Sequence, residues 1–532
     1  MMHARLSTQC MLIVVALMVT SACGGGGGGG GSSSPIPTPP TETTASDFER
    51  GIFSAASTYA NLCALPRGSG FDDTQGTTTD ENNWLRAWSH DLYLWYDEII
   101  DQDPTAFETP DYFDLMKTTA VTPSGNPKDK FHFTYPTEEW QQLSERGVAI
   151  GYGLDLVLKQ SSPPREILLG LVDVGSPAAN AGLTRGVRVL TVDGIDAING
   201  DSEADVDGLN DALFPDAIGE THEFEVEDFD GKNRRMVSLT SAQLNRNPVP
   251  LKALGLPSSG FEEVAYLLFN RHIATAEAGL IDAMQQFSDA GVTQLILDLR
   301  YNGGGFLDIA NELAFMIAGP SATQNVFFTQ IEFNDQHPTQ NPVTSEALQP
   351  EPFLTTAQGF SAPSGTPLPS LNLSRVFVLS SATTCSASEA IINGLRGIGL
   401  EVVLIGQATC GKPYGTYPAD NCGTTYFSTQ FRGVNNLGFG DYADGFIPDP
   451  SPSEPFEVIG CAVEDDFSRA LGDPEEAMLA TALNYIESNT CGSAGLRISQ
   501  TSKTNRSAEK KIHLDAPPRP QLKPRYLPGM IK

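Results

Sequence analysis

The sequence predicts a multidomain protein of mixed α/β class, and three observations support that prediction. The chain has 532 residues, of which 40% are hydrophobic and 8% aromatic, enough for several hydrophobic cores. Residues 46–145 show the three- and four-residue spacing of helices, and residues 146–244 have the pattern of short strands and turns. Residues 245–490 alternate apolar strands with helical stretches. Such alternation is typical of βαβ units around a parallel sheet.

The charge balance excludes one class of function. The chain carries 33 Lys and Arg against 65 Asp and Glu, a net charge of −32. A nucleic-acid binder needs a basic face, so we do not expect this function. Residues 491–532 hold nine Lys or Arg and two Asp or Glu, a net charge of +7, which leaves −39 for the rest. We expect this basic tail to be disordered, and it could contact anionic lipid or the acidic body.

The first 45 residues have the composition of an export signal and a tether. Residues 1–22 carry Arg5 and a short apolar run that is too short to span a bilayer, as in a signal peptide. The segment Thr20-Ser21-Ala22-Cys23 resembles a bacterial lipobox, which implies lipidation of Cys23. Residues 23–45 are rich in Gly, Ser and Pro, the composition of a flexible tether. We expect a lipid-anchored protein of the cell envelope, at the outer membrane and facing the periplasm.

Six cysteines remain beyond Cys10 and Cys23, and in an exported chain we expect them to pair. Their spacing shows no CxxC or Cys/His pattern, so we expect no metal site. Turn-rich residues between Cys410 and Cys422 favour a Cys410–Cys422 bridge, with Cys422–Cys461 as the chief competitor. The six are Cys63, Cys385, Cys410, Cys422, Cys461 and Cys491.

The helical N-terminal region, residues 46–145, contains an aromatic stripe. Trp84, Trp88, Leu92 and Trp95 recur at three- and four-residue steps, which places them on one face of a helix. A stripe of this kind is more often a core face than a ligand site. We therefore expect it to pack in the interior.

Residues 146–244 contain a short loop that resembles a known motif. Gly151-Tyr152-Gly153-Leu154 is similar to the carboxylate-binding loop of a PDZ domain, and residues 174–183 and 185–194 are similar to the strand–helix–strand centre of bacterial PDZ modules. PDZ grooves add a peptide strand to a sheet edge and hold its terminal carboxylate with backbone N–H groups. The resemblance implies that Gly151, Tyr152, Gly153 and Leu154 bind protein substrates with apolar C-termini. The alternative is a PDZ-shaped spacer without a ligand.

Residues 245–490 place a Ser and a Lys after neighbouring strands. The predicted strands are 264–269, 295–299, 376–380 and 402–406. Ser386 opens a helical stretch after the third strand, and Lys412 follows the fourth. The carboxyl ends of parallel strands meet at one edge, so the two side chains can lie close together although they are 26 residues apart. A desolvated Lys loses its proton more easily and can serve as general base for a Ser hydroxyl.

These motifs resemble the C-terminal processing (tail-specific) serine peptidases over residues 147–486, with a PDZ domain followed by a ClpP/crotonase-like α/β core. The matching motifs are Asp298-Leu299-Arg300, Asn302-Gly303-Gly304-Gly305, Ser386-Ala387-Ser388-Glu389 and Gly411-Lys412. The resemblance implies a Ser386 nucleophile, a Lys412 base, an oxyanion hole from Ala387 and Gly303 or Gly304, and no cofactor. It implies a serine endopeptidase acting on unfolded or C-terminally tagged proteins. Where many members carry a Gln that orients the Lys, this chain has Thr416.

Several alternatives stay open at this point. His272 is a weaker candidate for the base, and Ser388 is expected to cap the helix rather than attack. Cys385 is expected to be packed or paired, and the acidic run that includes Asp465 is expected to be a solvated loop. A non-catalytic peptide-binding protein and an esterase-type acyl hydrolase are the rival functions. The sequence also leaves open whether an adaptor lipoprotein takes part.

Overall fold

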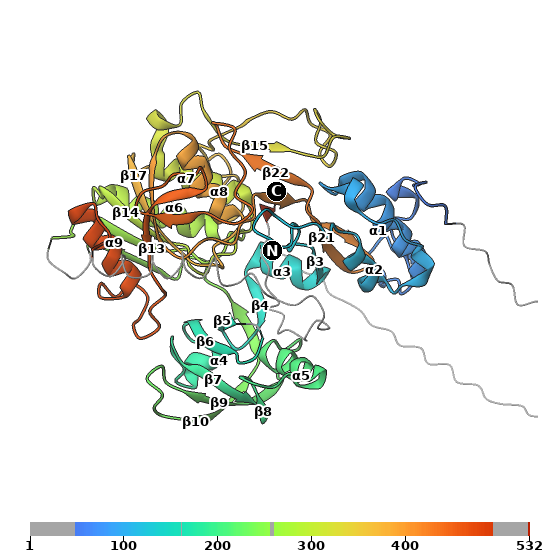
Figure 1. Cartoon of the computed structure of the whole chain (residues 1–532), viewed down its shortest axis with the longest axis horizontal. Coiled ribbons are helices and arrows are strands. Elements are labelled where there is room, and N and C mark those ends of the chain that lie inside the picture. The colour runs from blue at the N-terminus through green and yellow to red at the C-terminus, as the bar shows by residue number, and fades with distance from the viewer. Residues whose placement is uncertain (1–47, 161, 256–259, 493–529, 532) are drawn as a thin grey trace, which may run out of the picture. The chain divides into compact units, whose positions relative to one another are not determined.

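The computed structural model describes residues 48–160, 162–255, 260–492 and 530–531 (Figure 1). The expected signal peptide, the lipidation site Cys23, the tether and most of the basic tail lie outside the described residues. Within the described part, no helix is both long and apolar enough to cross a membrane. The mixed α/β class predicted from the sequence is confirmed.

The N-terminal region combines helices with short strands. Thr77 caps α1 by accepting the Asp80 N–H, and the Asp80 carboxylate accepts the Thr77 N–H in return, a capping box that begins the helix. Trp84, Trp88 and Leu92 are buried in one cluster, as predicted, whereas Trp95 lies beyond the helix end and packs on Tyr414. The elements are η1 (Ala56–Thr58), β1 (Leu62–Cys63), β2 (Thr74–Gln75), α1 (Thr78–Leu92), η2 (Tyr96–Glu98), η3 (Pro104–Ala106), α2 (Thr109–Leu115), β3 (Phe133–Pro136) and α3 (Thr137–Arg146).

The next region is an antiparallel sheet with its own apolar core. Its strand order is β10-β9-β7-β6-β5, so β5 lies at an edge, and β8 pairs with β7. Two further strands, β4 and β11, pair with each other. The elements are β4 (Val148–Gly151), β5 (Leu154–Gln160), β6 (Glu166–Val172), α4 (Pro177–Asn180), β7 (Arg188–Val192), β8 (Ile195–Asp196), α5 (Glu203–Leu213), β9 (Thr221–Glu227), β10 (Arg235–Thr240) and β11 (Ala242–Asn245).

The third region is built on a seven-stranded sheet in the order β12-β13-β14-β17-β18-β24-β23. The strands are parallel except for the antiparallel pair of β12 with β13. The predicted strands are confirmed within one residue at each end. The elements are β12 (Leu251–Leu254), β13 (Val264–Leu268), α6 (Ala276–Asp289), β14 (Gln294–Asp298), α7 (Leu307–Ala322), β17 (Arg375–Ser380), α8 (Ala387–Gly397), β18 (Glu401–Gly406), β23 (Ile447–Asp449), β24 (Glu457–Ala462) and α9 (Ala477–Ser488).

Alternating side chains of this sheet face two separate cores. Leu295 and Leu297 of β14 join α6, α7 and α8 in one cluster, whereas Ile296 joins α9 in another. The strands read as continuous apolar runs because both faces are covered by helices. The result is a three-layer arrangement that leaves the carboxyl ends of β14, β17 and β18 side by side.

Two smaller sheets attach to this core. In one, the order is β16-β15-β22-β19-β25, from β15 (Phe327–Glu332), β16 (Glu351–Pro352), β19 (Tyr414–Thr416), β22 (Phe431–Val434) and β25 (Met530–Ile531). In the other, β20 (Ala419–Asn421), β21 (Thr424–Phe427) and β3 pair in that order. Of the basic tail beyond Gly492, the structure describes only Met530 and Ile531, which form β25 and pair with the edge of β19.

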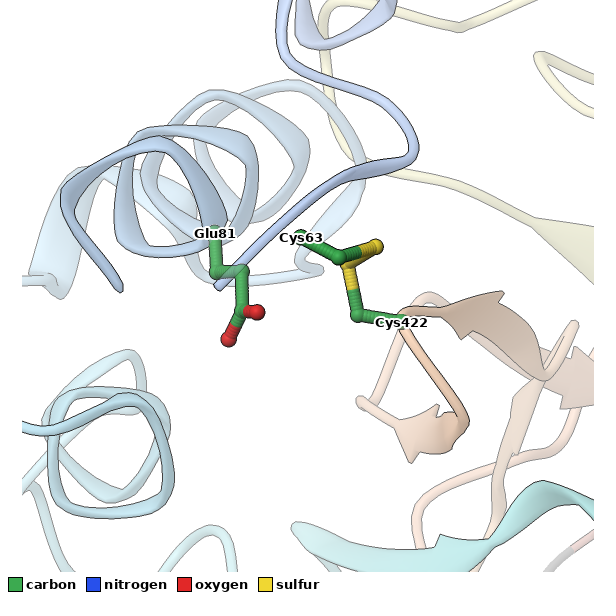
Figure 2. Close-up of side chains that lie close together, drawn as sticks. All are labelled: Cys63, Glu81 and Cys422. Carbon is green, nitrogen blue, oxygen red and sulfur yellow. A yellow bond between two sulfur atoms is a disulfide. The ribbon is translucent and has the colours of Figure 1, made fainter. Parts of the chain in front are cut away.

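The three disulfides correct the pairing expected from the sequence, since neither Cys410–Cys422 nor Cys422–Cys461 is formed. Cys63 pairs with Cys422, 359 residues away, with a Cα–Cα distance of 5.4 Å. Pairing of β3 with β21 brings the N-terminal region onto the β20–β21 hairpin, and Figure 2 shows the resulting bond beside Glu81 of α1. The other two pairs are Cys385–Cys410 and Cys461–Cys491.

Candidate active site

The glycine turn that follows β14 is organised by Asn302. Its Oδ1 accepts the Gly304 N–H at 2.9 Å, and its Nδ2 donates to the Phe269 carbonyl at 2.9 Å. Gly304 has a φ of +100°, and a Cβ there would lie 2.9 Å from the Ala387 nitrogen and from the Ser386 Cβ. Only glycine allows this backbone to approach the start of α8 so closely.

Ser386 lies at the N-terminus of α8 in a strained conformation. Its φ is +60° and its ψ is −112°, values that cost a non-glycine residue on the order of 1–3 kcal/mol. The preceding segment is fixed because Thr384 and Thr383 donate to the Leu299 and Arg300 carbonyls, each at 2.8 Å. Ser386 is 0% exposed, and its Oγ has no hydrogen-bond partner among the described residues. The turn thus holds a buried hydroxyl at the start of α8.

Glu389 joins the nucleophile turn to the loop of Lys412. Its carboxylate accepts backbone N–H groups from Ser386 at 2.8 Å, Lys412 at 2.8 Å and Gly411 at 2.9 Å. The Thr409 hydroxyl donates to the same carboxylate at 2.5 Å. Burial raises the pKa of Glu389, and these four donors oppose that shift. One side chain therefore fixes the backbone on both sides of the site.

Lys412 lies just past β18, and its side chain is buried. Burial lowers the pKa of Lys412 from 10.5 to about 8, while the carboxylates of Asp129 and Glu389 act in the opposite direction. The Lys412 Nζ lies 4.8 Å from the centre of the Phe131 ring, and the neighbouring Lys130 Nζ donates to the Cys410 carbonyl at 2.8 Å. A Lys in this environment is neutral in part near pH 7, as a general base requires.

The structure brings the two predicted residues to adjoining loops. The last paired residues of β17 and β18 are Ser380 and Gly406, so both loops leave the same edge of the sheet. Beyond that edge, Cys385 and Cys410 are joined by a disulfide with a Cα–Cα distance of 5.2 Å. Cys385 is thus paired, in agreement with the sequence prediction.

His272, the weaker candidate for the base, is completely buried next to the glycine turn. Its Nδ1 donates to Asn302 Oδ1 at 3.0 Å, and its Nε2 has no partner among the described residues. Burial lowers the pKa of His272 to about 3. An imidazole with this pKa is a poor proton acceptor.

A buried ion network lies beneath the glycine turn and reaches the antiparallel sheet. Arg300 pairs with Asp298, Asp465 and Glu476, and Arg185, from the loop before β7, pairs with the same Asp465. Asp465, expected in a solvated loop, is therefore a buried ion-pair partner. The Arg300 guanidinium has more N–H donors than Asp298 and Glu476 accept, so a donor remains for Asp465.

The predicted carboxylate loop lies between β4 and β5. Tyr152 is buried, and its hydroxyl donates to the Ala212 carbonyl of α5 at 3.0 Å. Gly153 has a φ of +80°, and a Cβ there would lie 2.2 Å from Ser176. Gly151 ends β4 and Leu154 begins the edge strand β5. The loop therefore stands at the start of an open sheet edge.

Two roles differ from the sequence expectation. Ser388 does not cap α8, because its hydroxyl donates to the Asn302 carbonyl at 3.0 Å and so fastens the helix to the glycine turn. The bridging role of Glu389 was not foreseen, although a Glu three residues after a Ser that opens a helix is a capping-box signal. Thr416 occupies the position at which the resemblance implies a Gln. Its buried Oγ1 has no partner among the described residues.

Two groups of side chains have the spacing of metal ligands within the described part of the chain. They are Cys63, Glu81 and Cys422 (Figure 2), and Cys385, Glu389 and Cys410. In each group both sulfur atoms form a disulfide. A disulfide sulfur is not the thiolate that binds a metal.

Comparisons with known proteins relate part of this chain to one family of peptidases. A model of peptidase family S41 matches residues 263–424, which contain Gly303, Ser386 and Lys412. The carboxyl-terminal-processing protease of Picosynechococcus is 28% identical over 273 residues, 51% of this chain and 56% of that protein. The chloroplastic C-terminal processing peptidase of Tetradesmus obliquus is 26% identical over 50% of this chain and 52% of that protein. The matches thus span about half the length of these curated relatives.

A solved structure shows the same fold. An S41 protease from Bacteroides fragilis superposes with a TM-score of 0.55 at 23% identity, covering 80% of this chain and 100% of that one. The resemblance that the sequence motifs carry is therefore confirmed: residues 263–424 match peptidase family S41, and about half of the chain is similar to carboxyl-terminal-processing proteases.

Proposed function

We propose that this chain is a serine endopeptidase with a Ser386/Lys412 dyad. The observation that carries the proposal is the shared anchoring of the two residues. Glu389 accepts the backbone N–H of both, and burial lowers the pKa of the Lys412 amine to about 8. A hydroxyl without a partner and a partly neutral amine on adjoining loops are what nucleophilic catalysis requires.

The reaction follows from this arrangement. Ser386 attacks a peptide carbonyl while Lys412 takes its proton, and Lys412 then returns that proton to the leaving amine. The oxyanion receives the N–H of Ala387 and one from the glycine turn. Since the Gly304 N–H already donates to Asn302, Gly303 is the second donor. Water then hydrolyses the acyl-enzyme.

The substrate is an extended polypeptide. The described end of this chain adds as a parallel strand to β19, where Gly415 and Thr416 pair with Met530 and Ile531. This edge begins two residues after Lys412, so an extended peptide can lie beside the dyad. Main-chain pairing of this kind favours a peptidase over an esterase.

The antiparallel sheet supplies a second peptide site. The open edge of β5 and the Gly151–Leu154 loop match the requirements of a PDZ groove, in which backbone N–H groups hold a terminal carboxylate. We therefore assign substrates with apolar C-termini to this loop. Lipidation at Cys23 would place the enzyme in the cell envelope, facing the periplasm.

Access to the dyad requires movement. Ser386 is 0% exposed and Lys412 is 2% exposed, and the segment of Lys130 and Phe131 packs on the Lys412 loop. A substrate therefore reaches the buried hydroxyl only after the site opens. The described conformation is thus a closed one.

The test compares wild type with Ser386→Ala and Lys412→Ala. We expect wild type to degrade an unfolded protein and to be labelled at Ser386 by a fluorophosphonate, and both variants to lose both activities by at least about 100-fold. Circular dichroism establishes that the variants are folded. Full activity in Lys412→Ala would refute the dyad, and hydrolysis of simple esters without any proteolysis would favour an acyl hydrolase.

A further inference from the structure

A disulfide spans the two loops that carry the proposed dyad. Cys385 directly precedes Ser386, and Cys410 precedes Lys412 by two residues. Their Cα atoms are 5.2 Å apart. The bond therefore joins the nucleophile turn to the loop of the base at the point where both have left the sheet.

The side chain of Lys412 is buried and is held by packing. Its ammonium packs over the Phe131 ring, and the hydroxyl of Thr416, four residues further on, is buried without a partner among the described residues. The loop is held through its backbone, by Glu389 and by the Cys410 N–H, which donates to the Thr384 carbonyl at 3.0 Å. The position of the amine thus depends on where the backbone of its loop lies.

The strands alone do not fix that position. The paired residues of β17 and β18 end at Ser380 and Gly406, five and four residues before the two cysteines. Hydrogen bonds that bridge the remaining gap can open and close, whereas a covalent bond sets an upper limit on the separation of the two loops. A misplacement of about 1 Å at a catalytic group can cost about 100-fold in rate.

We propose that the Cys385–Cys410 disulfide is a positioning element that holds the Lys412 amine next to the Ser386 hydroxyl, and that reduction of this disulfide lowers the activity of the enzyme. This inference rests on the proposed Ser386/Lys412 dyad. Neither cysteine reacts with substrate, so both act through the residues that follow them.

The switching step is thiol–disulfide exchange. A thiolate of a dithiol reductant attacks one sulfur of the pair, and the mixed disulfide is resolved by its second thiol. The reductant becomes a cyclic disulfide, and Cys385 and Cys410 each gain one electron and one proton as thiols. Cys410 is partly exposed whereas Cys385 is 6% exposed, so we expect attack at the Cys410 sulfur.

The chain offers a matched control. Cys461 of β24 and Cys491 beyond α9 form a second disulfide that closes a segment of similar length, with a separation of 30 residues against 25. It lies in the core on the α9 face of the sheet, away from the two loops. Removing it tests the effect of losing a disulfide as such.

The experiment compares full-length wild type with Cys385→Ala/Cys410→Ala and Cys461→Ala/Cys491→Ala, each before and after dithiol treatment. The readouts are kcat and KM for peptide hydrolysis and the rate of fluorophosphonate labelling of Ser386. We expect the dithiol to lower kcat and labelling of wild type by at least about tenfold with KM within about twofold. The Cys385→Ala/Cys410→Ala variant should show this low kcat and labelling rate before treatment and should not change when the dithiol is added. The control variant Cys461→Ala/Cys491→Ala should behave like wild type.

The pH profile separates positioning from general stability. A loosened loop admits water to the Lys412 amine, so the inflection in the labelling rate should move from about 8 towards 10.5 in the reduced protein. If Cys385→Ala/Cys410→Ala does not fold, reduction and reoxidation of wild type replace it, with mass spectrometry to identify the free thiols.

Unchanged labelling in a protein whose Cys385 and Cys410 are shown to be reduced would overturn the inference while leaving the dyad intact. An equal loss in Cys461→Ala/Cys491→Ala would also overturn it, because the effect would then be one of stability. Absence of any labelling or hydrolysis in oxidised wild type would overturn the proposed function, and the inference with it.

Discussion

The pKa of Lys412 gives the sharpest prediction about the proposed dyad. Burial lowers it from 10.5 to about 8. At pH 7 about one amine in eleven is then neutral, against about one in 3,000 for an ordinary Lys, a difference of about 3 kcal/mol in the free energy of deprotonation. Because only the neutral amine accepts a proton, we expect activity to rise about tenfold per pH unit below pH 8 and to level off above it.

The assay is the rate constant for fluorophosphonate labelling of Ser386 between pH 6 and pH 10, which reports activation of the hydroxyl without a protein substrate. Ser386→Ala serves as the control for labelling elsewhere. Asp129→Asn removes a carboxylate that favours the charged amine, so its inflection should fall below that of wild type. A flat profile, or an inflection near 6.5 as for a free imidazole, would refute the assignment of Lys412 as base.

Three further predictions concern individual side chains. Glu389→Gln keeps the shape of the side chain but loses the charged acceptor of four donors. The rate of fluorophosphonate labelling of Ser386 should therefore fall at least about tenfold, and the melting temperature should fall as well. A wild-type labelling rate together with a wild-type melting temperature would contradict the bridging role. Gly304→Ala places a Cβ 2.9 Å from the Ala387 nitrogen at a φ of +100°, so labelling should be lost and unfolding in urea should need about 1–3 kcal/mol less; an unimpaired variant would show that the turn can relax. Burial raises the pKa of Glu312 in α7 from 4.5 to about 8. The contribution of this protonated side chain to the free energy of unfolding is therefore complete below pH 4.5 and is lost as the pH rises through 8. Urea unfolding at several pH values should show this decline in wild type and a smaller decline in Glu312→Gln, and equal pH dependence in the two proteins would contradict the prediction.

Much of the core could be predicted from the sequence because its signals are local. The strands of the central sheet are continuous apolar runs bounded by turns, and they form where the pattern places them. The proximity of the Ser386 and Lys412 loops followed from the rule that parallel strands end at one edge. The sequence therefore predicts that these two loops adjoin, and the Cys385–Cys410 disulfide joins them.

The disulfides and the ion network could not be predicted in this way, because they depend on contacts between distant segments. Cys63 meets Cys422 across 359 residues only because β3 pairs with β21. Asp465 is buried only because Arg300 and Arg185 converge on it from two regions of the chain. Neighbouring turn residues carry no information about such partners.

The burial of the site also explains why a Lys is a better candidate for the general base than a His. Both candidate bases are buried, and burial disfavours the charged form of each. For Lys412 the pKa falls from 10.5 to about 8, within about one unit of neutral pH. For His272 it falls from 6.5 to about 3, where the imidazole no longer takes a proton from a hydroxyl. A site buried this deeply therefore needs a base whose ordinary pKa is high. The proposed base Lys412 meets that requirement, while His272 donates to Asn302 of the glycine turn.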